Sequence, residues 1–456
     1  MSRPCCDEFS RRAVAGAGLR AIEPGMPLPA GTGMSRRGFV ARSLGLALTV
    51  YGTTLSGTGP LGLFDEGIAS AAAGPRGRIL VSVFMPGGAD GLSMLYPAGD
   101  PLYAKLRPKL ALSGGQAFTE DPRLAWHPSL SPLAQLHAEG KVTALPAIGY
   151  DHPDQSHFTS RHYWEVGATD TELRTGWLGR YLDEVGTADN PLQGLSLSGQ
   201  LEPVLATARV PVAAIAGPDQ YSFGTSGVWG PVADRMLETL GRFGDLRTND
   251  PALRAVGDVA TQSDQLRRQL LPFADKTKLA SPVPYPQSRD DFPGHLAGLA
   301  AMIGAGLPLH CVALEAGGEY DTHVDEAAAL APALDTTAQS LLAFQRDLES
   351  RGVADRVLTL VWSEFGRRAE ENGSGGTDHG AAGNAFLIGT RAAGRMVGEF
   401  PGLARGLDAD GNVKPTADFR GVYLSLLEQW LDFDAARIVP EAGKFARPKL
   451  VRASAI

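Results

Sequence analysis

After about residue 74, the chain alternates between two apolar patterns. Short, nearly continuous apolar runs end in glycine or polar turn residues, which is typical of strands buried on both faces of a sheet. Longer segments between them repeat apolar residues at spacings of three and four, as amphipathic helices do. The strand-like runs are 78–85, 142–148, 310–315, 356–362 and 384–389, and the clearest helical segments are 295–305, 326–348 and 421–431.

This alternation predicts an α/β fold with a mostly parallel sheet sandwiched by helices. The segment from about 203 to 287 differs, because it is rich in proline and glycine, carries a polar helical pattern over 251–271 and has no clear buried strand run. We interpret it as an inserted cap segment over the core. The run Gly194–Gly199 misses the G-x-S-x-G spacing of a nucleophile elbow and is expected to form a strand and turn.

The first 73 residues follow another pattern and are expected to lie outside the folded domain. The segment Ser35-Arg36-Arg37-Gly38-Phe39-Val40 precedes a modestly apolar stretch, 44–51, and small residues at 69–73. This order predicts an export signal with a cleavage site, and the paired arginines indicate the twin-arginine route. The expected organisation is a disordered or mis-started extension over 1–33, a twin-arginine signal peptide over 34–73 and one mature domain over 74–456.

The predicted export route bears on partners and location. The twin-arginine translocation machinery is the expected partner, and it exports folded proteins, often with a metal or cofactor already bound. We therefore expect a periplasmic, cell-wall-associated or extracellular protein. No mature stretch approaches about eighteen uninterrupted apolar residues, so no stable membrane span is expected.

Charge and cysteine content exclude several classes of ligand and site. Seven of the 42 basic and five of the 50 acidic residues lie in the first 73, which leaves the mature chain with a net charge of −10. Without basic runs, such a chain is not expected to bind nucleic acid. Cys5 and Cys6 precede the mature chain, so Cys311 is its single cysteine. We therefore expect no intramolecular disulfide and no cysteine-based zinc cluster there, and a buried thiol at Cys311.

Polar side chains follow the ends of successive predicted strands, where open α/β sheets build their sites. Asp90 follows the first run, Asp321 and His323 follow the 310–315 run, and Glu364 follows the 356–362 run. Residues two apart in an extended chain point to the same side, so Asp321 and His323 can share one ion.

Two further segments carry similar chemistry. His379 lies in Thr377-Asp-His-Gly380, just before the last run, and 150–164 contains three of the nine histidines. Any single Asp or His is more often a cap or a hydrogen-bonded core group. Repetition at successive strand ends instead favours a shared metal or oxyanion site. Arg367 could clamp an anion there or pair with a neighbouring Glu.

Taken together, these motifs resemble one family. They are the twin-arginine signal, F-x-P-G-G-x-D-G, D-x-x-x-x-S-H-F, G-G-x-x-D-T-H, S-E-F-G-R and D-H-G. The set is similar to that of the exported bacterial family labelled as domain of unknown function DUF1501, within the alkaline-phosphatase-like superfamily that includes sulfatases. The resemblance covers the whole mature chain. It implies an alkaline-phosphatase-like fold with metal ions at the carboxyl ends of the sheet and a Ser or Thr nucleophile at a helix start.

By order along the chain, the resemblance implies roles for particular residues. It makes Asp90 a metal ligand after the first strand, Asp321 and His323 the pair of one metal site, and His379 the ligand that closes that site. Glu364 falls where the superfamily often has Asp-His. The segment 156–164 has the pattern of a helix start, so either Ser156 or Thr159 is the implied nucleophile, activated by helix amides and a metal.

Three departures from the superfamily pattern limit these expectations. The Asp-to-His spacing is two, Phe365 stands where a ligand histidine would follow, and no Cys-x-Pro-x-Arg motif is present. The resemblance therefore does not carry over to a second metal, and sulfatase activity through a modified Cys or Ser is disfavoured. The expected function is a hydrolase of small anionic phosphate or sulfate esters that uses a divalent metal, Zn or Mn. The alternative is a non-catalytic secreted binding protein with a degenerate metal site.

Overall fold

The computed structural model describes residues 50–51, 77–221, 225, 228–246 and 248–453. A central sheet of nine strands runs in the order β1-β7-β6-β8-β2-β9-β12-β5-β13. Its members are β1 (Val50–Tyr51), β2 (Ile79–Phe84), β5 (Val142–Gly149), β6 (Gly194–Ser196), β7 (Val212–Ala214), β8 (Cys311–Glu315), β9 (Val357–Trp362), β12 (Gly383–Ile388) and β13 (Ala417–Asp418). Two small pairs lie outside it, β3 (Leu95–Pro97) with β4 (Leu124–Trp126), and β10 (Arg367–Glu371) with β11 (Thr377–His379).

The sheet is mostly parallel, as the sequence predicts. Strand β2 pairs in parallel with β8 and β9, and β6 pairs in parallel with β7 and β8. Strand β12 instead pairs antiparallel with both β9 and β5. Because β12 runs the other way, its first residues lie at the edge where β9 and β5 end. The loop before β12 therefore joins the loops that follow its neighbours.

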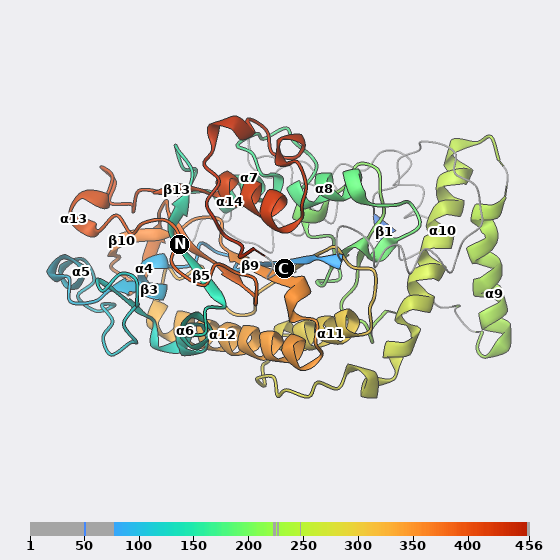
Figure 1. The fold of residues 1–456 in the computed structure, drawn as a ribbon, viewed down its shortest axis with the longest axis horizontal. Helices are drawn as coiled ribbons and strands as arrows, with labels where there is room; N and C mark the ends of the chain where they lie inside the picture. Colours follow the sequence, from blue (N-terminus) through green and yellow to red (C-terminus); the bar gives the residue numbers. More distant parts are fainter. Residues whose placement is uncertain (1–49, 52–76, 222–224, 226–227, 247, 454–456) are drawn as a thin grey trace.

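Helices cover both faces of the sheet (Figure 1). On one side lie α6 (Ser131–Ala138), α11 (Phe292–Gly304) and α12 (Glu326–Ser350), and on the other lie α7 (His157–Val166), α8 (Trp177–Val185) and α14 (Phe419–Ser425). A π-helical turn, Leu426–Trp430, continues α14. The shorter helices are α4 (Gly91–Met94), α5 (Pro101–Leu106) and α13 (Leu403–Gly406).

The alternation of side chains along the strands divides the core into two layers. In β2, Ile79, Val81 and Val83 pack toward α11 and α12, while Leu80 and Phe84 pack toward α8 and α14. Both faces are fully buried, which explains why the strand sequences show continuous apolar runs rather than alternation. Cys311 is buried in β8 and is a free thiol, as expected.

The predicted cap segment needs a correction at its start. Val212–Ala214 forms β7, a buried strand of the central sheet, so the chain just beyond residue 203 belongs to the core. Because β7 is only three residues long, the sequence shows no apolar run there that would predict a strand. The polar helical pattern at 251–271 is confirmed as α10 (Pro251–Leu270), which packs with α9 (Pro231–Gly241) to form an arm at one end of the molecule (Figure 1).

Most of the segment predicted to be an export signal lies outside the described residues. The predicted extension, the paired arginines and the cleavage site are all in that undescribed part. Of the predicted signal segment, Val50–Tyr51 is described, and it pairs antiparallel with Val212–Ala213 at the sheet edge. In the described part of the chain, no helix is long and apolar enough to cross a membrane.

Candidate metal centre

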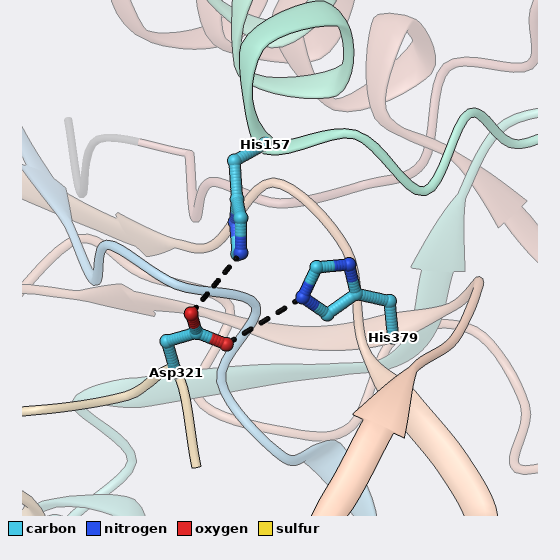
Figure 2. A group of neighbouring side chains, drawn as sticks. All are labelled: His157, Asp321 and His379. Carbon is cyan, nitrogen blue, oxygen red and sulfur yellow. Dashed lines mark ion pairs between the residues drawn. The ribbon is translucent and has the colours of Figure 1, made fainter. Parts of the chain in front are cut away.

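Three side chains from distant parts of the sequence converge at the carboxyl edge of the sheet. They are His157 at the start of α7, Asp321 in the loop after β8, and His379 at the end of β11 (Figure 2). One nitrogen or oxygen ligand atom from each lies within 4.8 Å of the others. The reversed direction of β12 brings His379 to this edge, because the chain must return there before β12 begins.

The distances suit ligands of one ion. Nε2 of His157 lies 3.5 Å from Oδ2 of Asp321, and Nε2 of His379 lies 3.5 Å from Oδ1 of the same carboxylate. Two atoms that each bind a tetrahedral ion at about 2 Å are about 3.3 Å apart. Two imidazoles and one carboxylate are also a donor set that Zn and Mn accept. The residues present therefore fit a divalent metal.

Both histidines are oriented by hydrogen bonds at their other ring nitrogen. Nδ1 of His157 lies 2.7 Å from Oε1 of Glu364, and Nδ1 of His379 lies 2.7 Å from the carbonyl oxygen of Gln155. Each partner is an acceptor, so Nδ1 carries the proton in both rings. In the neutral ring, Nε2 is then the atom with a free lone pair, as in metal-binding histidines backed by a carboxylate or carbonyl.

The burial of His157 supports its role as a metal ligand. Its side chain is 5% exposed, and Nε2 has no hydrogen-bond partner among the described residues. A buried polar atom without a partner is rare in folded proteins. It points toward Asp321 and His379 (Figure 2), and a metal ion between the three side chains would satisfy it.

His323 stands at the mouth of this group. Its Nε2 lies 3.2 Å from Oδ1 of Asp321 and 2.9 Å from Nε2 of His379, and its Nδ1 lies 3.3 Å from Asp378. The side chain is 36% exposed, which contrasts with the buried His157. His323 can therefore approach an ion as an additional ligand from the solvent side.

The charges around Asp321 keep it ionised. Burial alone would raise the pKa of this carboxyl, but the close ring nitrogens of His157 and His379 and the charge of Arg367 hold it well below its usual range. Burial would lower the pKa of His157, yet the nearby carboxylates of Asp321 and Glu364 raise it to about 9. Burial lowers the pKa of His379. At neutral pH the metal-free site thus contains a carboxylate, one imidazolium and one neutral imidazole.

Arg367 serves the structure rather than a substrate. Its guanidinium is fully buried, lies 2.5 Å from Oδ1 of Asp321 and donates to the carbonyl oxygens of Gly87, Gly88 and Thr377. Of the two predicted roles, anion clamp and ion pair with a neighbouring Glu, the structure is nearer the second, but the partner is Asp321. It ties the loop after β2 to Asp321 and to β11, so it fixes the relative positions of the ligands.

Asp90 lies in a separate buried cluster, which corrects its predicted role as a ligand. Both of its carboxylate oxygens accept hydrogen bonds from Arg107, and it also caps α4 through the N–H of Leu92. Burial would raise the pKa of Asp90, but Arg107 holds it below its usual range. A carboxylate paired in this way has no free face for a metal ion.

Glu326, at the start of α12, completes this cluster. It accepts hydrogen bonds from Ser93 at 2.9 Å, from Thr322 at 3.2 Å and from Thr377 at 2.6 Å. Burial and the negative charge of Asp90 raise the pKa of Glu326. The cluster therefore lies behind the metal centre and anchors the residues that adjoin Asp321 and Asp378.

Glu364 and Phe365 explain why the structure offers one compact ligand group. Glu364 accepts from His157 and from the backbone N–H groups of Gly87 and Gly88, so the predicted ligand is a support behind His157. The buried Phe365 ring lies 4.9 Å from the His157 ring and 4.8 Å from the His379 ring, measured between centroids. An apolar ring thus packs against both imidazoles, and it offers no donor atom to an ion.

The two predicted nucleophiles lie on the same helix but differ in direction. Ser156 is the half-buried N-cap residue of α7, directly before His157, and its hydroxyl makes no capping bond. Thr159 comes two residues after His157, which is about 200° around the helix axis. Thr159 therefore points away from the side that His157 occupies, whereas Ser156 directly precedes His157 at the start of the helix.

Sequence reasoning did not select His157 as a ligand. The residue stands in the S-H-F motif, and a histidine directly after the N-cap of a helix that follows a buried strand was the available signal. The folded chain brings together the predicted Asp321, His323 and His379, adds His157, and leaves Asp90 and Glu364 outside the ligand group.

Comparison with known proteins places the chain in a family. The model of the family described as "Protein of unknown function (DUF1501)" matches residues 123–430, which is more than half of the chain. The protein therefore belongs to the DUF1501 family. No curated protein matches it.

Several solved structures share a distant likeness. A protein in the alkaline phosphatase superfamily from Vibrio parahaemolyticus is 9% identical, with a TM-score of 0.33 over 96% of this chain and 78% of that chain. The PsFucS1 sulfatase from Pseudoalteromonas sp. is 11% identical, with a TM-score of 0.31 over 85% and 77%. The phosphonate monoester hydrolase SpPMH from Silicibacter pomeroyi is 12% identical, with a TM-score of 0.25 over 78% and 73%. These scores are low, so the fold described above rests on the chain's own sheet topology.

Proposed function

We propose that this chain is an exported, metal-dependent hydrolase of phosphate or sulfate esters in the alkaline-phosphatase-like superfamily. One divalent ion, Zn or Mn, is held by His157, Asp321 and His379, with His323 at the solvent side. The observation that carries the proposal is the buried Nε2 of His157, which has no hydrogen-bond partner among the described residues and lies 3.5 Å from Asp321.

The chain's own groups supply the rest of the site. The bound ion would act as a Lewis acid toward an ester oxygen. Glu364 and the Gln155 carbonyl keep the two imidazoles in the tautomer that presents Nε2. Ser156 places a hydroxyl at the positive end of α7, where helix amides favour negative charge. The ester class follows from the motif resemblance, and export through the twin-arginine route follows from the sequence signal.

The test is metal content by mass spectrometry on the exported, processed protein. We expect about one equivalent in the wild type. Separate His157→Ala, Asp321→Ala and His379→Ala variants should lose it. His152→Asn is the matched control, because His152 is exposed in the same loop and has φ 55°, a conformation that asparagine tolerates.

Turnover is tested next on the metal-loaded protein. A panel of phosphate and sulfate esters should reveal hydrolysis that requires the metal and falls sharply in Ser156→Ala. Hydrolysis that persists in the three ligand variants would contradict the proposal.

A secreted binding protein is the second candidate, and two observations favour it. The ring of Phe365, which stands where the motif resemblance expects a ligand histidine, packs against His157, and Arg367 is fully engaged with Asp321 and backbone carbonyls. A well-folded wild type without metal and without turnover would support this candidate and lead to screening of anions and glycans.

A further inference from the structure

Arg368 on β10 has a guanidinium group that no other described residue binds. Its Nε atom is buried without a hydrogen-bond partner, and its side chain makes no ion pair within the described part of the chain. Arg107, Arg161 and Arg367, near the same edge of the sheet, each pair with a carboxylate. A buried donor without a partner is destabilising and rare in folded proteins. It therefore indicates a ligand that the chain itself does not supply.

The alternation of side chains along β10 sets the direction in which Arg368 points. Its neighbours Arg367 and Ala369 are buried, and Arg367 contacts Asp321. Successive side chains of a strand leave opposite faces. The side chain of Arg368 therefore leaves the outer face of the β10–β11 pair, where it is half-buried.

Asn412 lies on one side of Arg368. The two residues form an antiparallel bridge, and the N–H of Ala369 donates to the carbonyl oxygen of Gly411 at 3.1 Å. In this arrangement positions 368 and 412 exchange no backbone hydrogen bond, and the side chains of such a pair share a face and lie close together. Oδ1 of Asn412 accepts a hydrogen bond from Nε2 of Gln155 at 3.3 Å. Arg368 therefore lies beside the loop that leads into α7.

Asp378 of β11 lies on the other side of Arg368. Burial would raise the pKa of Asp378, but its hydrogen bonds with Asn372 and His323 and the charges of His323 and Arg368 lower it. Oδ1 of Asp378 lies 3.1 Å from Nδ2 of Asn372 and 3.3 Å from Nδ1 of His323. Other groups thus hold this carboxylate, and Arg368 is near it without an ion pair. Because His323 stands at the mouth of the metal centre, Arg368 lies beside that mouth.

An oxyanion is the ligand that suits such a group. The Nε and Nη hydrogens of a guanidinium point side by side, so they can bind two oxygens of one phosphate or sulfate group. The backbone of Arg368 is fixed, because its carbonyl oxygen accepts a hydrogen bond from Arg107 at 2.9 Å. The side chain therefore projects from a fixed point with donors available to an anion.

We propose that Arg368 binds the anionic oxygens of the ester at the mouth of the metal centre. This is one of the two roles that the sequence suggested for the neighbouring Arg367. The inference rests on the proposed function, because Arg368 holds the substrate whose oxygen the ion polarises. It also sets specificity, since a neutral ester would leave the donors of Arg368 unpaired.

The first test is calorimetric titration of inorganic phosphate, and separately of inorganic sulfate, into the metal-loaded, processed protein. Arg368→Gln should weaken the binding of at least one of these anions by about 10- to 100-fold, because hydrogen bonds between charged groups are strong. Arg368→Lys should lose less affinity, because it keeps the charge and loses only the planar fork.

Arg395→Gln is the matched control. Arg395 is exposed and follows Gly394, whose N–H donates to Thr143 near the start of β5, at the opposite edge of the sheet. Its removal changes the net charge by the same amount, and the anion affinity should equal that of the wild type. Unchanged affinity for both anions in Arg368→Gln would overturn the proposal, and so would a wild type that binds neither anion.

Metal content distinguishes a residue that binds substrate from one that only supports the ligands. The Arg368→Gln, Arg368→Lys and Arg395→Gln variants should all hold as much metal as the wild type. Loss of metal from Arg368→Gln would overturn the proposal, because Arg368 would then act on the metal centre rather than on the substrate.

Failure of this inference differs measurably from failure of the proposed function. If the wild type holds metal and hydrolyses esters while Arg368→Gln keeps the same kcat/KM, Arg368 is excluded and the function stands. If the wild type holds no metal, the function fails, and the same titrations on the metal-free protein test Arg368 alone. A loss of anion affinity in Arg368→Gln then supports an anion site, and an unchanged affinity overturns it.

Discussion

Glu364 accepts a 2.7 Å hydrogen bond from Nδ1 of His157, and this contact orients the opposite ring nitrogen toward Asp321. The carboxylate is itself fixed by the N–H groups of Gly87 and Gly88, so the loop after β2, the end of β9 and the start of α7 meet at one point. The metal centre thus depends on a support that does not touch the ion.

Weakening this support should lower metal affinity. We expect Glu364→Gln to weaken metal binding by about 10- to 100-fold, because the amide holds the imidazole less firmly and makes it less basic. Competition with a chromogenic chelator measures the change. Glu370→Gln is the control, because Glu370 is exposed on the adjoining β10, and its affinity should equal that of the wild type. An unchanged affinity in Glu364→Gln would show that the His157–Glu364 bond has no role in binding.

His323 and His379 should contribute unequally. His379 is largely buried and belongs to the compact ligand group, whereas His323 is exposed at its mouth. We expect His379→Ala to abolish stoichiometric metal and His323→Ala to retain it with a faster rate of loss to a chelator. Equal loss in both variants would make His323 a full ligand, as the sequence predicts.

Packing against Phe365 should make Gly88 irreplaceable. Gly88 has φ +69°, and a Cβ there would lie 2.1 Å from the Phe365 ring. Gly99 has φ +75° with nothing within 4 Å of its Cβ position. Urea unfolding should therefore show a loss of about 1 kcal/mol for Gly99→Ala and at least about 2 kcal/mol more for Gly88→Ala. Equal losses would mean that the loop moves away from Phe365 without cost.

The buried Glu326 should make stability depend on pH. Burial and Asp90 raise its pKa in the folded chain above the ordinary value of 4.5. The folded state therefore binds this proton more tightly than the unfolded state does. This stabilisation is complete below pH 4.5 and is lost as the pH rises through the raised value.

The matching variant is Glu326→Gln, which cannot ionise. Relative to this variant, the wild type should lose about 1–3 kcal/mol of unfolding free energy between acidic and alkaline pH. Denaturant unfolding across this range, in both proteins, measures the difference. A constant difference at all pH values would show that Glu326 has the same proton affinity in the folded and unfolded chains.

The layers of the fold follow from the pattern of apolar residues along the chain. The strands β2, β5, β8, β9 and β12 lie where continuous apolar runs predicted them, because a strand buried on both faces must be apolar throughout. Helices α11, α12 and α14 likewise follow from their periodicity. The same reasoning missed β7, since three residues are too few to establish a pattern.

Which polar residues form the metal centre depends on contacts between distant parts of the folded chain. Asp90, Asp321 and Glu364 all follow strands, and nothing in the sequence distinguishes them. In the structure, Asp90 pairs with Arg107 and Glu364 pairs with His157, whereas Asp321 lies between two imidazoles. Sequence spacing specifies where a side chain leaves the sheet edge. The partner that it meets there depends on strand order and on the reversed direction of β12, which are set by packing between residues far apart in the chain.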